Sequence, residues 1–413
     1  MGSRRTILLF VAGVCLLAMA SGIFEPTFNN YVGEVFDITA DARGDLELPR
    51  EFPGFMVAVT AGTLFFLGEV NLSLIGAMLV AGGMFGLAAF AQQSDQYGRM
   101  VAFLVLWSTG AHLTMPVVQS LALALAGREK EGEKLGKLGA VRSVAVIVGS
   151  GIVVLNFRVL RLSFPTVFCT AMFVALLAGV AFFLLKRSMP ELPHGHRPRL
   201  MVRRRYGLYY VLCVLFGARK QIFITFGPWV LIRVYGQTAG DIALLWIVAE
   251  VLKVMFLPLV GRLIDRVGER AVLIGDAALL LLVCITYGFA GDVLPEGPAF
   301  FAVCGAFVLD LMLFPVQMAR STYLSKIAES RRDISGTLGL GVSIDHAVSI
   351  PIAMLGGRLW TAFGSHRPVF VAASCLALIT ALACSFIRIR GALHPELVEE
   401  PLEALEDIRQ ERL

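Results

Sequence analysis

Long apolar runs separated by short polar stretches repeat along this chain of 413 residues. A helix needs about 20 apolar residues to cross a bilayer. The pattern therefore predicts an all-α polytopic membrane protein with about twelve spanning helices. They are expected near residues 7–36, 52–66, 72–91, 100–125, 141–155, 165–185, 206–234, 242–260, 271–290, 300–324, 338–360 and 368–387. The polar stretch Asp37–Glu51 is expected to be a loop, and the first run is too long for a cleaved signal peptide.

The longest polar connection, Lys186–Arg205, divides the predicted helices into two sets of six. It contains three prolines and seven basic residues, a composition typical of a linker. We therefore expect two pseudo-symmetric six-helix bundles, over residues 1–186 and 206–390. Residues 187–205 would form a cytoplasmic linker, and residues 391–413 an acidic cytoplasmic tail.

Charge supports the membrane assignment and orients the chain. Only 16% of the residues are charged, whereas soluble domains contain about 25%. Cytoplasmic loops of membrane proteins are rich in Lys and Arg. Here the basic residues gather near the N-terminus, in the linker and after the eighth helix, at Arg262 and Arg266. Both termini are thus predicted to be cytoplasmic, with the helices in the plasma (inner) membrane.

Several function classes find no support in the sequence. The net charge of +5 is explained by cytoplasmic loops, so a nucleic-acid partner is not indicated. The seven cysteines lie in apolar segments and form no CxxC pair, which argues against disulfides and a zinc site. A phosphate-binding GxxxxGK[ST] loop is missing, and no catalytic constellation is present. We expect neither an enzyme nor a bound metal or cofactor.

One short motif suggests a family. Residues Gly261–Arg270 read GRLIDRVGER, which resembles the G-x-L-x-D-R-x-G-R/K loop of the major facilitator superfamily. That resemblance implies a gating loop with Gly261, Asp265, Arg266 and Gly268 as its main residues. It also implies two halves that rock about a central site, and a monomer. The motif's twin between the second and third helices is nearly absent here, and the signatures of proton-coupled drug exporters are missing.

Polar residues concentrate in the first, fourth, seventh and tenth predicted helices. In the superfamily that the motif resembles, these helices line the central cavity, so their polar residues become candidate substrate ligands. The candidates are Glu25, Asn29, Asn30, His112, Arg219, Lys220, Gln221, Asp310, Gln317 and Arg320.

Two adjacent cations, Arg219 and Lys220, interrupt the apolar run of the seventh helix. Each costs about 2.5–3.5 kcal/mol in a bilayer unless it faces water or a partner. Consecutive residues point about 100° apart on a helix, so the two side chains do not act as one clamp. We expect one to bind an anionic group and the other to pair with an acid, and Arg219 is favoured as the ligand.

Buried acids provide candidates for proton coupling. These are Glu25, Asp310 and Asp345, together with His346 beside Asp345, because histidine titrates near neutral pH when unperturbed. The alternative is that the acids only neutralise the membrane cations. Glu250 and Lys253 are three residues apart on the eighth helix and are expected to form an ion pair.

The sequence therefore favours a secondary active transporter of a small polar solute. Four cations within the predicted helices favour an anionic substrate, and they are Arg219, Lys220, Lys253 and Arg320. An equal number of acids keeps zwitterions and neutral metabolites open, namely Glu25, Glu250, Asp310 and Asp345. The expected partners are a small-molecule substrate, the lipid bilayer and protons. The alternative is an exporter of lipophilic drugs or lipids.

Overall fold

The structure of the chain is a computed structural model that describes residues 4–56, 67–126, 131–188, 202–329 and 331–388. Most of the predicted linker at 187–205 and all of the predicted tail at 391–413 lie outside these ranges. Within them the chain is helical, and the described residues contain no strand.

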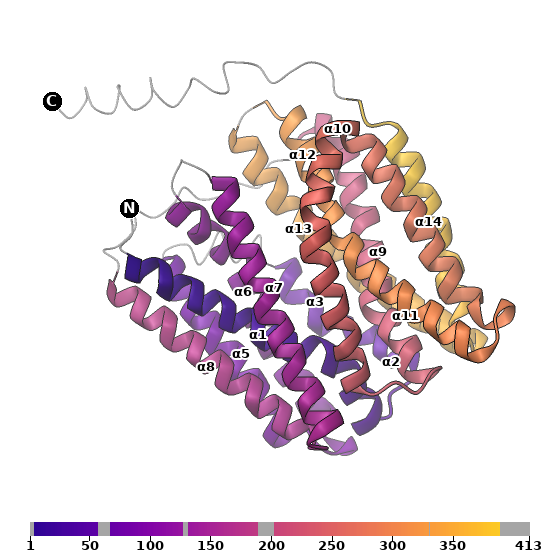
Figure 1. Ribbon diagram of the computed structural model, residues 1–413, viewed down its shortest axis with the longest axis horizontal. Coiled ribbons are helices and arrows are strands. Elements are labelled where there is room, and N and C mark those ends of the chain that lie inside the picture. Colours follow the sequence, from indigo (N-terminus) through magenta and orange to yellow (C-terminus); the bar gives the residue numbers. More distant parts are fainter. Residues whose placement is uncertain (1–3, 57–66, 127–130, 189–201, 330, 389–413) are drawn as a thin grey trace.

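The helices up to residue 188 form the N-terminal half, drawn in indigo to magenta in Figure 1. Helix α1 packs against α7 and α8, and α5 packs against α6 and α8. The helices are α1 (Arg4–Val35), α2 (Ala40–Asp45), α3 (Glu47–Phe55), α5 (Glu69–Phe90), α6 (Tyr97–Ala126), α7 (Glu131–Val154), which continues into a π-turn (Leu155–Val159), and α8 (Phe164–Ser188).

The helices from residue 204 onward form the C-terminal half, drawn in pink to yellow in Figure 1. Helix α10 packs against α11 and α14, and α9 packs against α13. The helices are α9 (Gly207–Arg233), α10 (Ala239–Val293), α11 (Glu296–Leu313), α12 (Met318–Ile327), α13 (Arg331–Phe363) and α14 (Arg367–Ser385).

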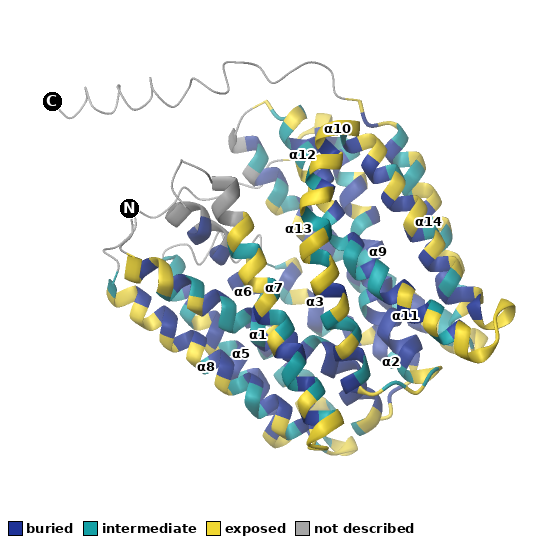
Figure 2. Cartoon of the chain, in the orientation of Figure 1, coloured by how far each residue is buried: buried dark blue, intermediate teal, exposed yellow. Residues whose placement is uncertain are grey.

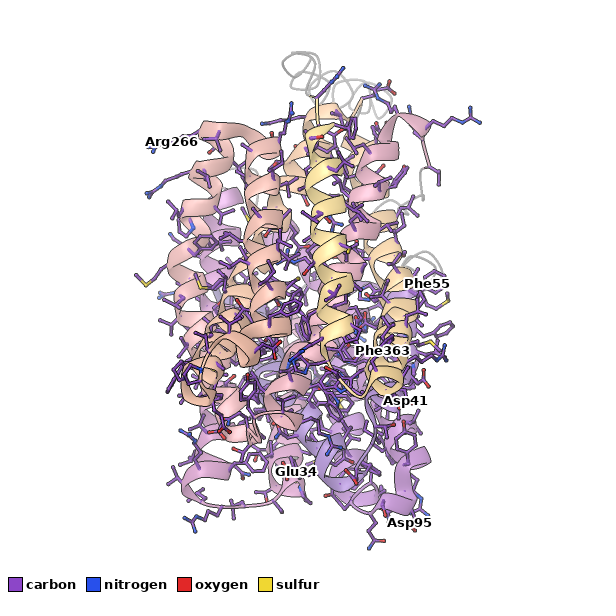
Figure 3. All side chains as sticks on the ribbon, turned by 90° about the vertical axis from the view of Figure 1, so that its right-hand side faces the viewer. Glu34, Asp41, Phe55, Asp95, Arg266 and Phe363 are labelled. Carbon is purple, nitrogen blue, oxygen red and sulfur yellow. The ribbon has the colours of Figure 1, made fainter. Side chains whose placement is uncertain are left out.

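Ten stretches within the described residues are long and apolar enough to cross a membrane. One of them, α10, is two helices joined at Gly268, whose φ of 81° is accessible mainly to glycine. The predicted gating loop Gly261–Arg270 is therefore helical on both sides of this kink. Asp265 and Arg266 are exposed there, and Arg266 lies at one end of the molecule in Figure 3.

The prediction of a polar loop at Asp37–Glu51 is wrong. Residues 40–45 and 47–55 form α2 and α3, and Arg43 and Glu47 are fully buried. Arg43, Glu47 and Arg50 are spaced by four and three residues, so a helix places them on one face. The predicted helix at 52–66 begins earlier, inside α3, and residues 57–66 lie outside the described ranges.

Side-chain burial follows the requirement of a bilayer. In Figure 2 the buried residues lie where helices face one another, and exposed residues lie on the outer faces of helices such as α8 and α14. Many of these exposed residues are large and apolar, including Phe173, Leu177 and Leu378. Such faces suit lipid, because the tails of lipids are as apolar as the side chains.

Two glycines bring α1 and α7 into close contact. A Cβ at Gly149 would lie 2.2 Å from the Met19 carbonyl oxygen, and one at Gly22 would lie 2.4 Å from the Val146 carbonyl oxygen. Small residues at helix interfaces let backbones approach in this way.

We therefore expect Gly149→Ala to lower the free energy of unfolding by about 1–3 kcal/mol, because the added methyl group forces the helices apart. The measurement is thermal unfolding of the purified protein in detergent. Gly151→Ala is the matched control, because a Cβ at Gly151 on the same helix meets nothing within 4 Å. Equal stability of the two variants would contradict the prediction.

The molecule has two ends along the helix axes, which Figure 3 marks by Asp95 and Arg266. We name them the Asp95 end and the Arg266 end. Toward the Asp95 end the two halves are joined by polar contacts. Arg233 donates to Asp37 at 3.0 Å and to the Ile38 carbonyl at 2.8 Å, and Arg158 pairs with Asp241 at 2.5 Å. The halves are therefore closed against each other toward this end.

Breaking the Arg158–Asp241 pair is expected to favour opening at the Asp95 end. The Arg158 side chain of this pair is half exposed, so the pair contributes at most about 1 kcal/mol. Asp241→Asn should therefore raise the open population about two- to fivefold. An impermeant maleimide applied from the Asp95 side would report this as faster labelling of Leu311→Cys in a background without native cysteines. Arg99→Gln, an exposed arginine near the same end, should leave the rate unchanged. A labelling rate in Asp241→Asn no faster than in the parent would contradict the prediction.

Candidate functional site

A small cavity lies between the two halves, with a volume of about 20 Å³, which is enough for one water molecule. Its polar lining consists of the Glu25 and Asp310 carboxylates and the Asn29 amide, and the rest of its lining is mostly aromatic and aliphatic. Helices α1, α9, α10 and α11 supply the lining residues, which are Glu25, Asn29, Phe223, Ile224, Pro228, Trp246, Phe307, Asp310 and Leu311.

A buried charge network in α2 and α3 borders this cavity. Arg43 donates to Asn29 Oδ1 at 2.7 Å and to Glu47 at 2.6 Å. Arg50 lies 3.2 Å from Glu47 and 3.0 Å from Glu25. The network thus connects buried α2 and α3 to two cavity-lining residues of α1, and its two arginines face two carboxylates.

Helix α3 also contacts the C-terminal half. The Thr225 hydroxyl donates to Glu47 at 3.2 Å, and the Lys220 ammonium lies 3.2 Å from Glu51 Oε2. His346 Nδ1 lies 2.7 Å from that same oxygen of Glu51. Because Glu47 and Glu51 belong to one half and their partners to the other, these contacts join the halves at the centre of the molecule.

A second charge cluster lies wholly in the C-terminal half. Arg219 lies 3.1 Å from Asp276 of α10 and 3.5 Å from Asp310 of α11. Within the described residues, Asp276 Oδ1 and Arg219 Nε are buried without a hydrogen-bond partner. Two carboxyl groups therefore share one guanidinium, and one proton on either carboxyl group would balance the charge of the cluster.

A third charge cluster is the ion pair between Arg320 of α12 and Asp345 of α13. The guanidinium donates two hydrogen bonds of 2.9 Å, one to each carboxylate oxygen. The guanidinium also lies over the Phe216 ring, 4.5 Å from the centroid. Bidentate pairs of this kind are strong and geometrically specific, so Asp345 neutralises Arg320 in this structure.

The other candidates from the sequence occupy varied surroundings. His112 contacts Ser108 and the His346 ring, whereas Gln221 donates to the Thr225 hydroxyl at 2.8 Å. The remaining four lie elsewhere: Asn30 donates to the Gln237 carbonyl at 2.8 Å, Gln317 is exposed, and Lys253 pairs with Glu250.

Sequence reasoning missed five charged residues of these clusters. They are Arg43, Glu47, Arg50 and Glu51, which were assigned to a loop, and Asp276, in the predicted helix at 271–290. A signal for the first four existed in their helical spacing just before an apolar run. Asp276 stood out as a lone acid within an apolar run, which membrane segments rarely retain without a role.

Comparison with known proteins places the chain in a family. A sequence model of the Major Facilitator Superfamily matches residues 52–349, which is more than half of the chain. The chain belongs to this superfamily. Among curated protein sequences, no relative matches significantly.

Several solved structures have the same fold as this chain at low sequence identity. A crystal structure of the nucleoside transporter NupG aligns with a TM-score of 0.72 and 12% identity, covering 93% of this chain and 99% of that chain. An auto-inhibited POT family peptide transporter aligns with a TM-score of 0.73 and 12% identity over 95% and 99% of the chains. The inward-open xylose transporter XylE from E. coli aligns with a TM-score of 0.68 and 14% identity, covering 96% of this chain and 98% of that chain.

Family and fold together establish the general function. The chain is an integral membrane protein with the major facilitator fold, and it is a secondary transporter. Transport in this fold proceeds by rocking of the two halves about a site near the midplane. The cavity described above and the charge network of α2 and α3 likewise lie between the two halves.

Proposed function

We propose that this transporter moves a small polar solute that is neutral or zwitterionic, and that protons drive the movement. The observation that carries the proposal is the lining of the cavity between the halves. Two carboxylates and an amide, from Glu25, Asp310 and Asn29, face aromatic residues such as Phe223 and Trp246. Acceptor groups opposite aromatic rings suit hydroxyl, amine or amide groups on a compact ring-shaped or small solute.

The sequence favoured an anionic substrate because of its membrane cations, and the described residues give that preference no support. Among them, the buried arginines Arg43, Arg50, Arg219 and Arg320 each contact a carboxylate, and so does Lys220. An anion would have to displace one of these partners. The names of two solved neighbours, a nucleoside transporter and a D-xylose–proton symporter, are compatible with a polar, uncharged solute.

Asp310 is the candidate proton carrier. It lines the cavity and shares Arg219 with Asp276, so a proton on Asp310 would bring the Arg219–Asp276–Asp310 cluster to neutrality. Glu25, which also lines the cavity, is held by Arg50. A proton that binds Asp310 would free part of the Arg219 guanidinium and so couple protonation to solute binding.

The orientation of the protein in the membrane follows from its basic residues. Arg262, Arg266 and Arg270 lie near the Arg266 end, as the positive-inside rule expects of the cytoplasmic side. We therefore assign this end and both termini to the cytoplasm of the plasma (inner) membrane. The structure then corresponds to a conformation that is closed toward the outside, in a protein that functions as a monomer with two six-helix halves.

The test is uptake into proteoliposomes with and without an inward proton gradient. The panel contains nucleosides, monosaccharides, amino acids, organic anions and lipophilic dyes. We expect saturable, gradient-stimulated uptake within the first three groups, and loss of that uptake in Glu25→Gln and Asn29→Ala. Asp45→Asn, a half-exposed acid outside the cavity, is the control. Uptake of organic anions alone, or transport of dyes without any response to polar solutes, would overturn the proposal.

A further inference from the structure

Three buried side chains that ligate metals in other proteins converge beside the central contacts. Glu51 lies on α3, His112 on α6 and His346 on α13, and all three are buried. One donor atom from each lies within 4.8 Å of the other two. None of these residues lines the cavity described above, so the substrate proposal does not use them.

Hydrogen bonding fixes the orientation of His112. Its Nδ1 lies 2.9 Å from the Ser108 carbonyl oxygen, which can only accept a hydrogen bond. Nδ1 therefore carries the hydrogen, and Nε2 presents a lone pair. Metal-ligating histidines are oriented in this way, with the second ring nitrogen donating to a carbonyl or carboxylate. The Ser108 hydroxyl is anchored in turn by the Arg50 carbonyl.

Gly54 leaves room between the two imidazoles. A Cβ at this position would lie 2.6 Å from His346 Nδ1 and 2.8 Å from His112 Nε2. Both nitrogens therefore lie beside Gly54, one turn along α3 from Glu51. Any larger residue at position 54 would press against both imidazoles, so glycine keeps the space next to the two nitrogens open.

We propose that Glu51, His112 and His346 bind a divalent transition-metal ion of the zinc class. Two imidazoles and one carboxylate form a donor set that zinc accepts, with a fourth position open to water. In this structure Glu51 Oε2 contacts Lys220 Nζ at 3.2 Å and His346 Nδ1 at 2.7 Å. Binding replaces both contacts with metal–ligand bonds, so the Lys220 ammonium competes with the metal for Glu51.

Such an ion would bridge the two halves. Glu51 and His112 belong to the N-terminal half, and His346 belongs to the C-terminal half. A ligand that binds one conformation stabilises it over the others. The metal therefore holds the halves in the arrangement seen here and slows transport. This consequence for transport rests on the proposed function, whereas metal binding itself does not.

The test uses the full-length purified protein, freed of affinity tags and of metal, with His194 and His196 changed to alanine. Those two histidines form an HGH sequence that could bind metal independently. The probes are Co²⁺, followed by its visible absorption, and Zn²⁺, followed by thermal stability. We expect one Co²⁺ per chain with a tetrahedral spectrum, and a higher unfolding temperature with Zn²⁺.

Variants separate this site from adventitious binding. His112→Ala and His346→Ala should each weaken binding about tenfold or more, and His366→Ala, a histidine outside the cluster, should not. Gly54→Ala should abolish binding with all ligands still present. Lys220→Gln should tighten binding, because it removes the competing cation. If a histidine variant fails to fold, the glutamine variant at the same position replaces it.

Retention of the Co²⁺ spectrum and of the Zn²⁺ stabilisation in the His112→Ala/His346→Ala double variant would overturn the proposal. A transport assay adds an independent arm, in which Zn²⁺ should slow uptake by the parent protein several-fold more than uptake by His346→Ala. Failure to find any transported solute would count against the proposed function and leave the binding result intact.

Discussion

Replacing Glu47 by glutamine is expected to lower the free energy of unfolding by about 3–5 kcal/mol. Glu47 is fully buried and contacts Arg43, Arg50 and Thr225. The amide has nearly the same shape as the carboxylate but no charge, so Arg43 would lose its carboxylate partner and Arg50 would keep that of Glu25. Removing one partner of a buried ion pair is costly because the other charge remains uncompensated.

Thermal or chemical unfolding in detergent measures this effect, and Asp45→Asn is the control. Asp45 precedes Glu47 by two residues, but its carboxylate is half exposed and lies 3.8 Å from Arg358. Its loss should change stability by about 1 kcal/mol or less. A Glu47→Gln variant as stable as Asp45→Asn would show that the α2–α3 network contributes little to the free energy of unfolding.

Asp310→Asn is expected to reduce proton-driven accumulation strongly while solute exchange across the membrane continues. An asparagine at this position cannot release a proton, but it can still accept a hydrogen bond in the cavity. We expect accumulation under a pH gradient to fall about tenfold or more, which corresponds to a loss of about 1.4 kcal/mol of driving force.

The measurement compares uphill uptake with counterflow in the same proteoliposomes. Asp292→Asn provides the control, because that acid is exposed at the protein surface and pairs only with Arg367 among the described residues. Uphill uptake at the parent level in Asp310→Asn would exclude Asp310 as the proton carrier and direct attention to Asp276.

The spanning stretches that the structure describes followed from the sequence because apolar length is a local property. Even α10, which the structure shows as one kinked element, was predicted as two helices because its charged centre interrupts the apolar run. The prediction for the α2–α3 segment failed for the opposite reason. Two acids of this segment also contact Lys220, Thr225 and His346, whose positions in space depend on the whole fold.

The sequence predicted which helices carry the site residues better than it predicted their ion-pair partners. The divergence of Arg219 and Lys220 was expected from helix geometry, and the structure directs them to Asp276 and Glu51 respectively. That both cations are neutralised was not expected. Predicting it required knowing that Glu51 lies in a helix and that α10 places Asp276 opposite α9. The helical spacing of the α3 charges was a local signal for the first fact, whereas the second depends on the whole fold.

The charged α2–α3 segment also has a consequence for how the protein reaches the membrane. A segment with Arg43, Glu47 and Arg50 gains little by entering lipid alone, because each charge costs about 2.5–3.5 kcal/mol at the membrane centre. Part of the compensation comes from Lys220 and Thr225, which the ribosome makes some 170 residues later. This segment should therefore settle at its final depth only after the C-terminal half has been synthesised and has docked.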